Sequence, residues 1–521
     1  MSAFNRIQML NYTPPSSDLQ YVLATVTGLL YNLSHGRVIV VSLFGEHLRI
    51  LVDSHKINIY GLAKSTGLER TAIHKIISGS RIPSDEYAYK LADALPLSPE
   101  EKARFLESFN ISKIGELKYR QRIQVKNLIE SIAYIENETG TAPATIIENS
   151  PLGEANTTAN GHFAVNRLVK SVIAETIVSE GNPEFDYIVP ESYQYFHNEL
   201  LACYLRYPEL KMRHIIAFTK TIDFMDNYNV NLTLLAHVLP FAFAPGAGYH
   251  PYFFYRTAHD TELMQAMPYF ILTATKLVLI NRDFSKAALI CDINIVELYK
   301  ESFDAMLNRA KPLIKHMDTT IEFLESFALA IDNNVDEPFY WLEPEPCIGP
   351  LCNDKIIDDY IKKDLPNRDE LVGLVCKHYG FLREQLTHIV NVCTTDGVYR
   401  VINTGYIYNA PAEIMHPFSR ETVKELLITL RNRSAENKTK MLFSNPSKLT
   451  MPSKTHLNIN RKNGVCFVMH EMESTNFRAI FLSEDSINEA FADFMESIEE
   501  SGLVYTEKDS LIVLDSIING L

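Results

Sequence analysis

The sequence predicts an α+β protein that is predominantly helical, with a small N-terminal helical domain, a connecting helix and a large mixed α/β body. Short helical patterns, each bounded by capping or helix-breaking residues, occupy residues 44–109. Runs rich in β-branched and aromatic residues alternate with helical patterns further along the chain. The chain has 521 residues and is 46% hydrophobic. It is too long for one hydrophobic core, so we expect about three packed units.

Residues 1–42 precede the first helical domain as an N-terminal extension. An apolar stretch from Tyr21 to Leu43 follows a Pro-Pro-Ser-Ser turn cluster. Polar residues such as Asn32 and Arg37 interrupt this stretch, and no basic region with a small-residue cleavage site precedes it. We therefore expect neither a signal peptide nor a membrane span. The extension is either an accessory helix or a segment that the native protein lacks.

The domain over residues 43–110 is expected to contain about five helices of roughly two to three turns each. Six residues that cap or break helices divide it: Asn58, Gly67, Gly79, Pro83, Pro96 and Ser98. Residues 111–137 lack proline and carry apolar residues at helical spacing, which predicts a longer connecting helix and a possible dimer contact. Residues 138–162 lack periodicity and are rich in Thr, Ala, Asn, Gly and Pro, so we expect a mobile linker there.

The body is expected to divide into a mostly helical middle region, 163–340, and an α+β C-terminal region, 341–521. Apolar residues at three- and four-residue spacing predict helices, and β-branched or aromatic runs bounded by turns predict strands. In the middle region the helices are expected over 193–207, 214–225 and 295–310, and the strands over 269–280 and 287–291. In the C-terminal region the strands are expected over 398–408, 456–460, 465–470 and 477–482, and the helices over 486–498 and 510–518.

The net charge of -15 taken as an average argues against a nucleic-acid-binding protein, because such affinity comes largely from Lys and Arg. The charge is unevenly distributed, however. Residues 44–126 contain 14 Lys and Arg against 10 Asp and Glu, a balance of +4, and residues 1–43 carry +1, which leaves -20 on residues 127–521. This division is typical of a basic binding domain on an acidic body, although an acidic body is also a soluble surface.

The seven cysteines are an odd number scattered through a long chain, unlike the disulfide framework of a small secreted domain. We therefore expect a reducing, cytoplasmic environment.

Between residues 44 and 83, local physical chemistry explains the pattern without reference to other proteins. Asn58 suits the N-cap of the second helix, where its side chain would accept a bond from a free backbone N–H. Gly67 suits a turn whose backbone needs a positive φ. Ala63 is small enough to let two helices cross closely. The small core is expected to contain Leu62, Ala63, Leu68, Ile73 and Ile76.

This pattern resembles the lambda-repressor-like, Cro/XRE family over residues 44–109. The similarity lies in the Leu48-Arg49 pair, in Leu62-Ala63, in Gly67 and in the Gly79-x-x-x-Pro83 ending. It implies a helix-turn-helix fold that binds double-stranded DNA, as a homodimer, and regulates transcription. The family often has a Gln at the start of the second helix, where this chain has Ile59.

The resemblance places the helix over 69–77 in the DNA major groove. Thr71 and His74 are expected to contact base edges, while Arg70, Lys75 and Arg81 suit either bases or phosphates. The full set of expected DNA contacts is Arg70, Thr71, His74, Lys75, Ser78, Ser80 and Arg81.

Two clusters in the body have a structural interpretation beside a functional one. Thiolate and imidazole groups at Cys347, Cys352, Cys376, His378 and Cys393 could ligate zinc, but their loose spacing favours buried, inert thiols. The aromatic segment 249–256, followed by His259 and Asp260, could line an effector pocket, while a hydrophobic core explains it better.

Catalytic patterns are missing from the sequence. It has no glycine-rich phosphate loop, no Gly-x-Ser-x-Gly elbow and no paired carboxylates at a catalytic spacing, and the His470-Glu471-x-Glu473 segment is too short for a zinc-hydrolase helix. We therefore expect no enzyme activity, no cofactor and no metal.

These features predict a cytoplasmic, sequence-specific DNA-binding transcription regulator from a bacterium or a mobile element. Its large body is expected to sense a small-molecule or protein effector, or to mediate oligomerisation, and no membrane contact is expected. The alternative is a protein-interaction component of the antitoxin or phage-immunity type, in which the helix-turn-helix is secondary. The operator, the direction of regulation and the effector do not follow from the sequence.

Overall fold

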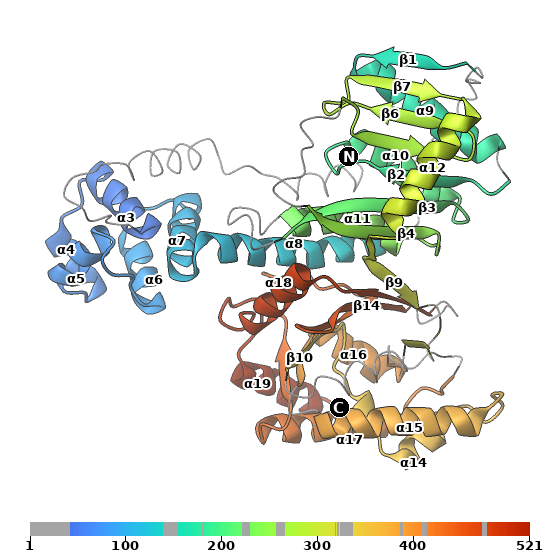
Figure 1. The fold of residues 1–521 in the computed structure, drawn as a ribbon. Coiled ribbons are helices and arrows are strands. Elements are labelled where there is room, and N and C mark those ends of the chain that lie inside the picture. The colour runs from blue at the N-terminus through green and yellow to red at the C-terminus, as the bar shows by residue number, and fades with distance from the viewer. Residues whose placement is uncertain are drawn as a thin grey trace. The chain divides into compact units, whose positions relative to one another are not determined.

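A computed structural model describes residues 42–138, 155–179, 181–220, 230–256, 266–317, 319, 322–323, 337–385, 389–407, 412, 414–470 and 477–521. The chain divides into two compact units, residues 1–123 and 124–521. Helices make up the described residues of the first unit, and two mixed sheets with their helices make up those of the second, which confirms the α+β class (Figure 1). None of the helices among the described residues has the length and apolar character needed to cross a membrane. The predicted extension lies outside the described residues up to position 41.

The first unit is built from short helices around a core of its own. Its helices are α3 (Leu43–Ser54), α4 (Ile59–Thr66), α5 (Arg70–Ile77), α6 (Asp85–Ala94) and α7 (Pro99–Ile114). Side-chain oxygens of Ser42, Asn58 and Ser98 cap the starts of α3, α4 and α7. The large side chains at the centre of this core are Phe44, Leu48, Ile73, Leu91 and Phe105, each without exposed surface.

Helix α8 (Glu116–Glu138) follows Gly115 and forms the predicted connecting helix. Leu128, Ile129 and Ile132 on its second half are buried. The carboxylate of Glu136 accepts hydrogen bonds from the backbone N–H groups of Ser453 and Lys454, at 2.7 and 3.1 Å. The apolar face of α8 from residue 124 onward therefore belongs to the core of the second unit and is not free for a dimer contact.

An eight-stranded sheet forms the first half of the second unit, in the order β1-β7-β6-β5-β2-β3-β4-β8. The strands are β1 (Thr157–Asn160), β2 (Glu184–Ile188), β3 (Lys211–Thr219), β4 (Tyr249–Arg256), β5 (Tyr269–Leu272), β6 (Leu277–Ile280), β7 (Lys286–Ile290) and β8 (Lys311–Pro312). Strands β2, β3 and β4 are parallel, and the other pairs are antiparallel.

Helices cover both faces of this sheet. The helices are α9 (His162–Ser179), α10 (Gln194–Arg206), α11 (Val230–Phe243) and α12 (Ile293–Leu307). On one face, the ring of Phe196 in α10 packs against Tyr187 of β2. On the other face, Phe303 of α12 packs against Phe270 of β5, and Figure 1 shows α12 lying across the sheet. The expected helices over 193–207 and 295–310 are thus confirmed as α10 and α12, as is the β-rich character of 269–291.

Two expectations in this half need correction. The helix expected over 214–225 is wrong, because Lys211–Thr219 form strand β3, and 221–225 lie outside the described residues. β3 lies between two strands and is buried on both faces, so its apolar residues do not alternate as those of a half-exposed strand do. Within the expected linker, Thr157–Asn160 form β1 against β7, while 139–154 lie outside the described residues.

A seven-stranded sheet forms the second half of the unit, in the order β12-β11-β10-β13-β14-β15-β9. The strands are β9 (Ile314–Met317), β10 (Phe339–Leu342), β11 (Ile389–Cys393), β12 (Lys440–Phe443), β13 (Thr455–Asn460), β14 (Gly464–His470) and β15 (Phe477–Leu482). The helices are α14 (Asp354–Tyr360), α15 (Arg368–Gln385), α16 (Thr395–Thr404), α17 (Arg420–Ala435), α18 (Asp485–Glu496) and α19 (Glu507–Asn519), with a short 3-10 helix at Gly349–Leu351.

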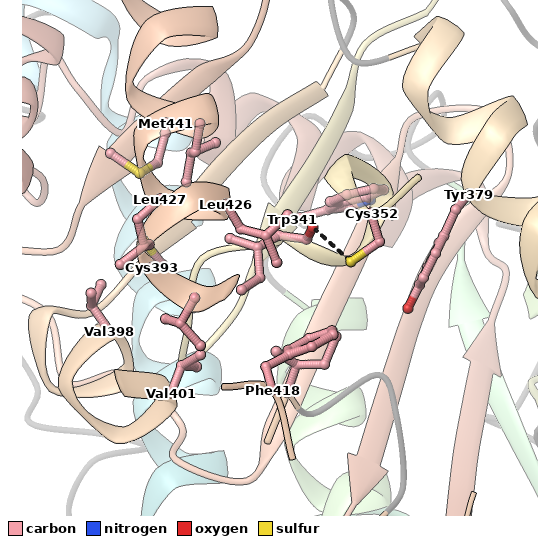
Figure 2. Close-up of a cluster of buried hydrophobic side chains, with 14 of the residues drawn as sticks. Trp341, Cys352, Tyr379, Cys393, Val398, Val401, Phe418, Leu426, Leu427 and Met441 are labelled. Atoms are coloured by element: carbon pink, nitrogen blue, oxygen red, sulfur yellow. Dashed lines mark hydrogen bonds between the residues drawn. The ribbon is translucent and has the colours of Figure 1, made fainter. Parts of the chain in front are cut away.

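The main core of this half lies between one face of the sheet and helices α14 to α17 and α19. Figure 2 shows part of it, with Trp341, Cys393 and Met441 from the strands and Val401, Leu426 and Leu427 from the helices. Helix α18 contacts β13 and β14. The strands expected over 456–460, 465–470 and 477–482 are confirmed as β13, β14 and β15.

The strand expected over 398–408 is wrong, because residues Thr395–Thr404 form helix α16, and Tyr408 lies outside the described residues. Thr394 caps the start of α16 by accepting a bond from the N–H of Gly397, and Gly405 ends it with a φ of 71°. Val398 and Val401 are buried three positions apart, which is helical spacing. Caps and spacing together outweigh the β-branched composition of the segment.

Candidate nucleic-acid interface

Helices α4 and α5 are joined by a tight turn that the local sequence determines. The side chain of Asn58 accepts a hydrogen bond from the N–H of Tyr60 at 2.9 Å and so begins α4. Gly67 ends α4 in the left-handed region, with a φ of 74°. The hydroxyl of Thr66 donates to the carbonyl of Leu62 at 2.7 Å from a buried position. These contacts fix where α4 begins and ends, and therefore where the turn into α5 starts.

The inner face of this helix pair is apolar, as predicted. Leu62, Leu68, Ile73 and Ile76 are buried in the core of the first unit, whereas Ala63 is only partly buried at its edge. Gly45 of α3 was not predicted to matter. A Cβ atom at this position would lie 2.4 Å from the carbonyl oxygen of Ile76, so α3 approaches the end of α5 more closely than any other residue allows.

The outer face of α5 is polar and open. Because Ala72, Ile73 and Ile76 point inward, the intervening side chains point away from the core. All seven side chains expected to contact DNA are exposed: Arg70, Thr71, His74, Lys75, Ser78, Ser80 and Arg81. The structure brings them together on α5 and the segment that follows it.

The segment after α5 is held by hydrogen bonds to one backbone carbonyl. The carbonyl oxygen of Lys75 accepts from the hydroxyls of Ser78 and Ser80, both at 3.0 Å, and from the N–H of Arg81 at 3.1 Å. Gly79 between them has a φ of 72°. The two serine hydroxyls therefore shape the end of α5, and this role could have been found from the Ser-Gly-Ser pattern after a helix.

Ion pairing distinguishes the cations on and just after α5 from several other cations of the first unit. Lys90 pairs with Glu86 at 2.6 Å, Lys113 pairs with Asp85 at 2.9 Å, and Lys102 pairs with Asp93. Within the part of the chain that the structure describes, Arg70 and Lys75 form no ion pair with an acidic side chain, and neither does Arg81. These three charges are therefore available to an anionic partner.

Comparisons with known proteins identify this region. Residues 48–102 match the family model described as helix-turn-helix. These residues form a helix-turn-helix domain of the Cro/XRE type. The match confirms the resemblance stated from the sequence, within the segment where it was stated.

No curated protein matches the chain. Among solved structures, TrmBL2, an archaeal chromatin protein whose structure is described as showing a novel mode of DNA binding, aligns with 51% of this chain and 99% of its own. The two are 12% identical, with a TM-score of 0.21. At that score the alignment carries no argument about fold or function.

Two exposed residues of α4, Tyr60 and Lys64, add to the outer surface of the helix-turn-helix domain. Ile59, which replaces the expected Gln, is half-buried and packs against the domain core. Tyr60, the next residue, is 64% exposed, and Lys64 one turn later is exposed as well. Sequence reasoning missed both, although an aromatic residue outside the apolar pattern of α4 was a visible signal.

The cysteine cluster predicted in the body consists of buried or partly buried free thiols. Cys352 donates to the carbonyl of Ile348 at 3.9 Å, and burial raises the pKa of its thiol to about 12. Burial also raises the pKa of Cys347 and Cys393, which keeps them as thiols. Among the described residues, no three His, Cys, Asp or Glu side chains are arranged to hold a metal ion.

The aromatic segment 249–256 forms β4, in which Tyr249 and Phe253 are core residues. Its expected neighbours His259 and Asp260 lie outside the described residues, as do Glu471 and Glu473.

Proposed function

We propose that this chain is a sequence-specific DNA-binding transcription regulator. The observation that carries the proposal is the exposed face of α5 in a Cro/XRE-type helix-turn-helix domain, with cations that pair with no acidic side chain of the described chain. Helices of this kind enter the major groove with their outer face. Unpaired Arg and Lys side chains there can neutralise phosphates without first breaking an ion pair.

The position of each side chain suggests its role. Thr71 and His74 lie on the exposed face of α5, so they suit base edges. Lys75 and Arg81 lie at its C-terminal end and after it, where the duplex backbone would pass, and Arg70 suits either bases or phosphates. Ser78 and Ser80 hold the segment that follows α5 in place through hydrogen bonds to the Lys75 carbonyl.

The remaining parts of the proposal concern assembly and the body. One helix-turn-helix domain makes few base contacts, so the protein is expected to act as a dimer on two half-sites about one helical turn apart. The acidic body would sense an effector or support the dimer, in a cytoplasmic protein that binds rather than catalyses.

Selection of bound sequences from random double-stranded DNA tests the proposal. The full chain should enrich one motif, with inverted half-sites if it binds as a dimer. The opposite result is that no motif is enriched, while affinity purification recovers a single protein at a stoichiometric ratio. In that case the helix-turn-helix domain is a protein-interaction module and the proposal is wrong.

Substitutions on α5 test which contacts specify the sequence. Replacing His74 or Thr71 by alanine should relax the preference at one or two positions, by about 1–3 kcal/mol for a direct contact. Lys75→Ala should instead weaken binding to all sequences and lower the salt slope by about 1. Lys90→Ala is the matched control, because Lys90 is paired with Glu86 on α6, and it should leave both quantities unchanged.

A further inference from the structure

A largely apolar cavity lies on the helical side of the seven-stranded sheet. Its open space is about 1120 Å³, counting the solvent at its mouth. Strand β10 contributes Trp341 to its wall, α15 contributes Val375 and Tyr379, and the segment before α17 contributes Phe418. Figure 2 shows Trp341, Cys352, Tyr379 and Phe418 gathered in one part of the core, although they come from separate elements. The largely apolar lining with one buried polar group is typical of a small-molecule site.

One polar group at this cavity is built into the sheet. The side chain of Glu343 is buried, with 4% of its surface exposed, and lines the cavity. Its Oε2 accepts a hydrogen bond from the amide of Asn391 at 2.8 Å, and its Oε1 lies 3.4 Å from Nδ1 of His456. The backbone N–H of Cys347 donates to Oδ1 of the same Asn391 at 3.3 Å. Since a carboxylate offers about four acceptor positions, it retains room for one more donor.

We propose that this cavity binds a small, mainly hydrocarbon molecule that carries one hydrogen-bond donor, an alcohol or an amine, directed at Glu343. The proposed binding site depends only on the cavity and its lining. Its role as the effector site of the body rests on the proposed function.

The same lining disfavours an anionic ligand. A carboxylate ligand would face the Glu343 carboxyl group in surroundings where charges are poorly screened. The other ionisable group that could help is His378, whose Nδ1 is enclosed and whose pKa burial lowers to about 4. His378 is therefore uncharged at neutral pH and offers no positive charge.

Intrinsic fluorescence gives a readout that is specific to this site. The chain contains one tryptophan, Trp341, and it lines the cavity. Titrating the full chain with octanol, octylamine and octanoate should therefore give a saturable change in emission with the first two. Octanoate should bind at least roughly tenfold more weakly, because it meets the Glu343 carboxyl group.

Substitutions locate the effect. Val375→Phe on α15 fills the cavity and should abolish the emission change. Val372→Phe is the matched control, because Val372 lies on the same helix, is also partly buried against the core and does not line the cavity. Glu343→Gln removes the carboxylate charge and should narrow the difference between octanol and octanoate to less than about threefold.

The outcomes separate binding from regulation. If no probe gives a saturable change up to its solubility limit, or if Val375→Phe and Val372→Phe respond alike, the site is wrong. Equal affinity for octanoate and octanol in the unsubstituted chain overturns the donor assignment. Affinity for the selected DNA is then measured with and without octanol. Saturable emission with unchanged DNA affinity leaves the ligand site in place and removes its effector role, whereas absence of an enriched DNA motif bears only on the proposed function.

Discussion

At the scale of single residues, Gly45 determines how closely α3 can approach the C-terminal end of α5. The carbonyl of Ile76 occupies the space that a side chain at this position would need. The backbone nitrogen of Gly79 would also lie only 3.1 Å from a Cβ atom at Gly45. The orientation of α5, and with it the exposed face that carries His74 and Lys75, depends on this contact. A glycine in the first turn of a helix is otherwise unfavourable, because it lowers helix propensity.

Gly45→Ala should therefore destabilise the first unit by about 1–3 kcal/mol, because the added carbon would overlap with a backbone atom. Gly61→Ala, within α4, is the control: nothing lies within 4 Å of its added Cβ. That change should stabilise the unit by about 0.5–1 kcal/mol through helix propensity. Calorimetry of the full chain measures both changes in stability. Binding to the selected DNA shows whether the orientation of α5 changes with them. Equal melting of the Gly45 and Gly61 variants would show that α3 has room to move.

At the scale of secondary-structure elements, the helix-turn-helix was predictable because its signals are local. The cap at Asn58, the turn at Gly67 and the inward spacing of Ile73 and Ile76 all lie within about twenty residues, and each appears in the structure as expected. The outward direction of His74 follows from the same spacing, so the exposed face could also be predicted. What each exposed side chain contacts could not, because that depends on a partner.

Strand β3 and helix α16 show why other elements could not be predicted as well. β3 is a strand because β2 and β4, distant in sequence, pair with it on both sides. α16 is a helix although Val398, Val401 and Ile402 favour strands, since packing against the core and caps at both ends outweigh propensity. Likewise, the cavity beside Trp341 is lined by segments that lie between Phe323 and Phe477 in the sequence, so no local pattern predicts it.

The face of the eight-stranded sheet under α10 predicts a dependence of stability on pH. Nε2 of His197 lies 3.0 Å from the carbonyl of Pro190, and Nδ1 of His214 lies 3.0 Å from the hydroxyl of Tyr249. Burial lowers the pKa of His197 to about 4 and that of His214 well below its usual value. The unfolded chain binds these protons near pH 6.5 and the folded sheet does not. Stability should therefore fall as the pH decreases from about 6.5 toward 4.

The loss is on the order of 1 kcal/mol per pH unit for each of the two histidines. Thermal unfolding of the full chain at neutral and mildly acidic pH measures it. His197→Gln keeps a donor for the Pro190 carbonyl without titrating, so it should reduce the slope. His162→Gln, at an exposed position at the start of α9, should leave the slope as it is. A slope that the His197 substitution does not reduce contradicts this account.

At the scale of the whole molecule, the two units differ in charge and in size. The first unit has its own core and the basic surface, whereas residues 127–521 carry a balance of -20. If the chain binds DNA as proposed, an acidic body should repel random DNA at low ionic strength, while specific contacts of α5 would act at short range and be less affected by this repulsion. On that proposal, the body should favour specific over non-specific DNA binding even before any effector is considered. A second copy of the domain, held by the body, would add to this preference.

A fragment of residues 42–123 should accordingly fold but discriminate poorly. Its specificity ratio, the affinity for the selected DNA divided by that for random DNA, should fall at least about tenfold below that of the full chain, because the second half-site is no longer bound by the same molecule. Its affinity for random DNA should exceed that of the full chain at low salt, and the difference should shrink at high salt as the repulsion is screened. Binding titrations of both proteins on both DNAs, across a salt series, give the two quantities.

Replacing the body by an unrelated neutral dimer separates the effect of the second half-site from that of the repulsion, because it restores binding to the second half-site without restoring the repulsion. If the bare fragment discriminates as well as the full chain, the body contributes neither dimerisation nor repulsion to DNA binding.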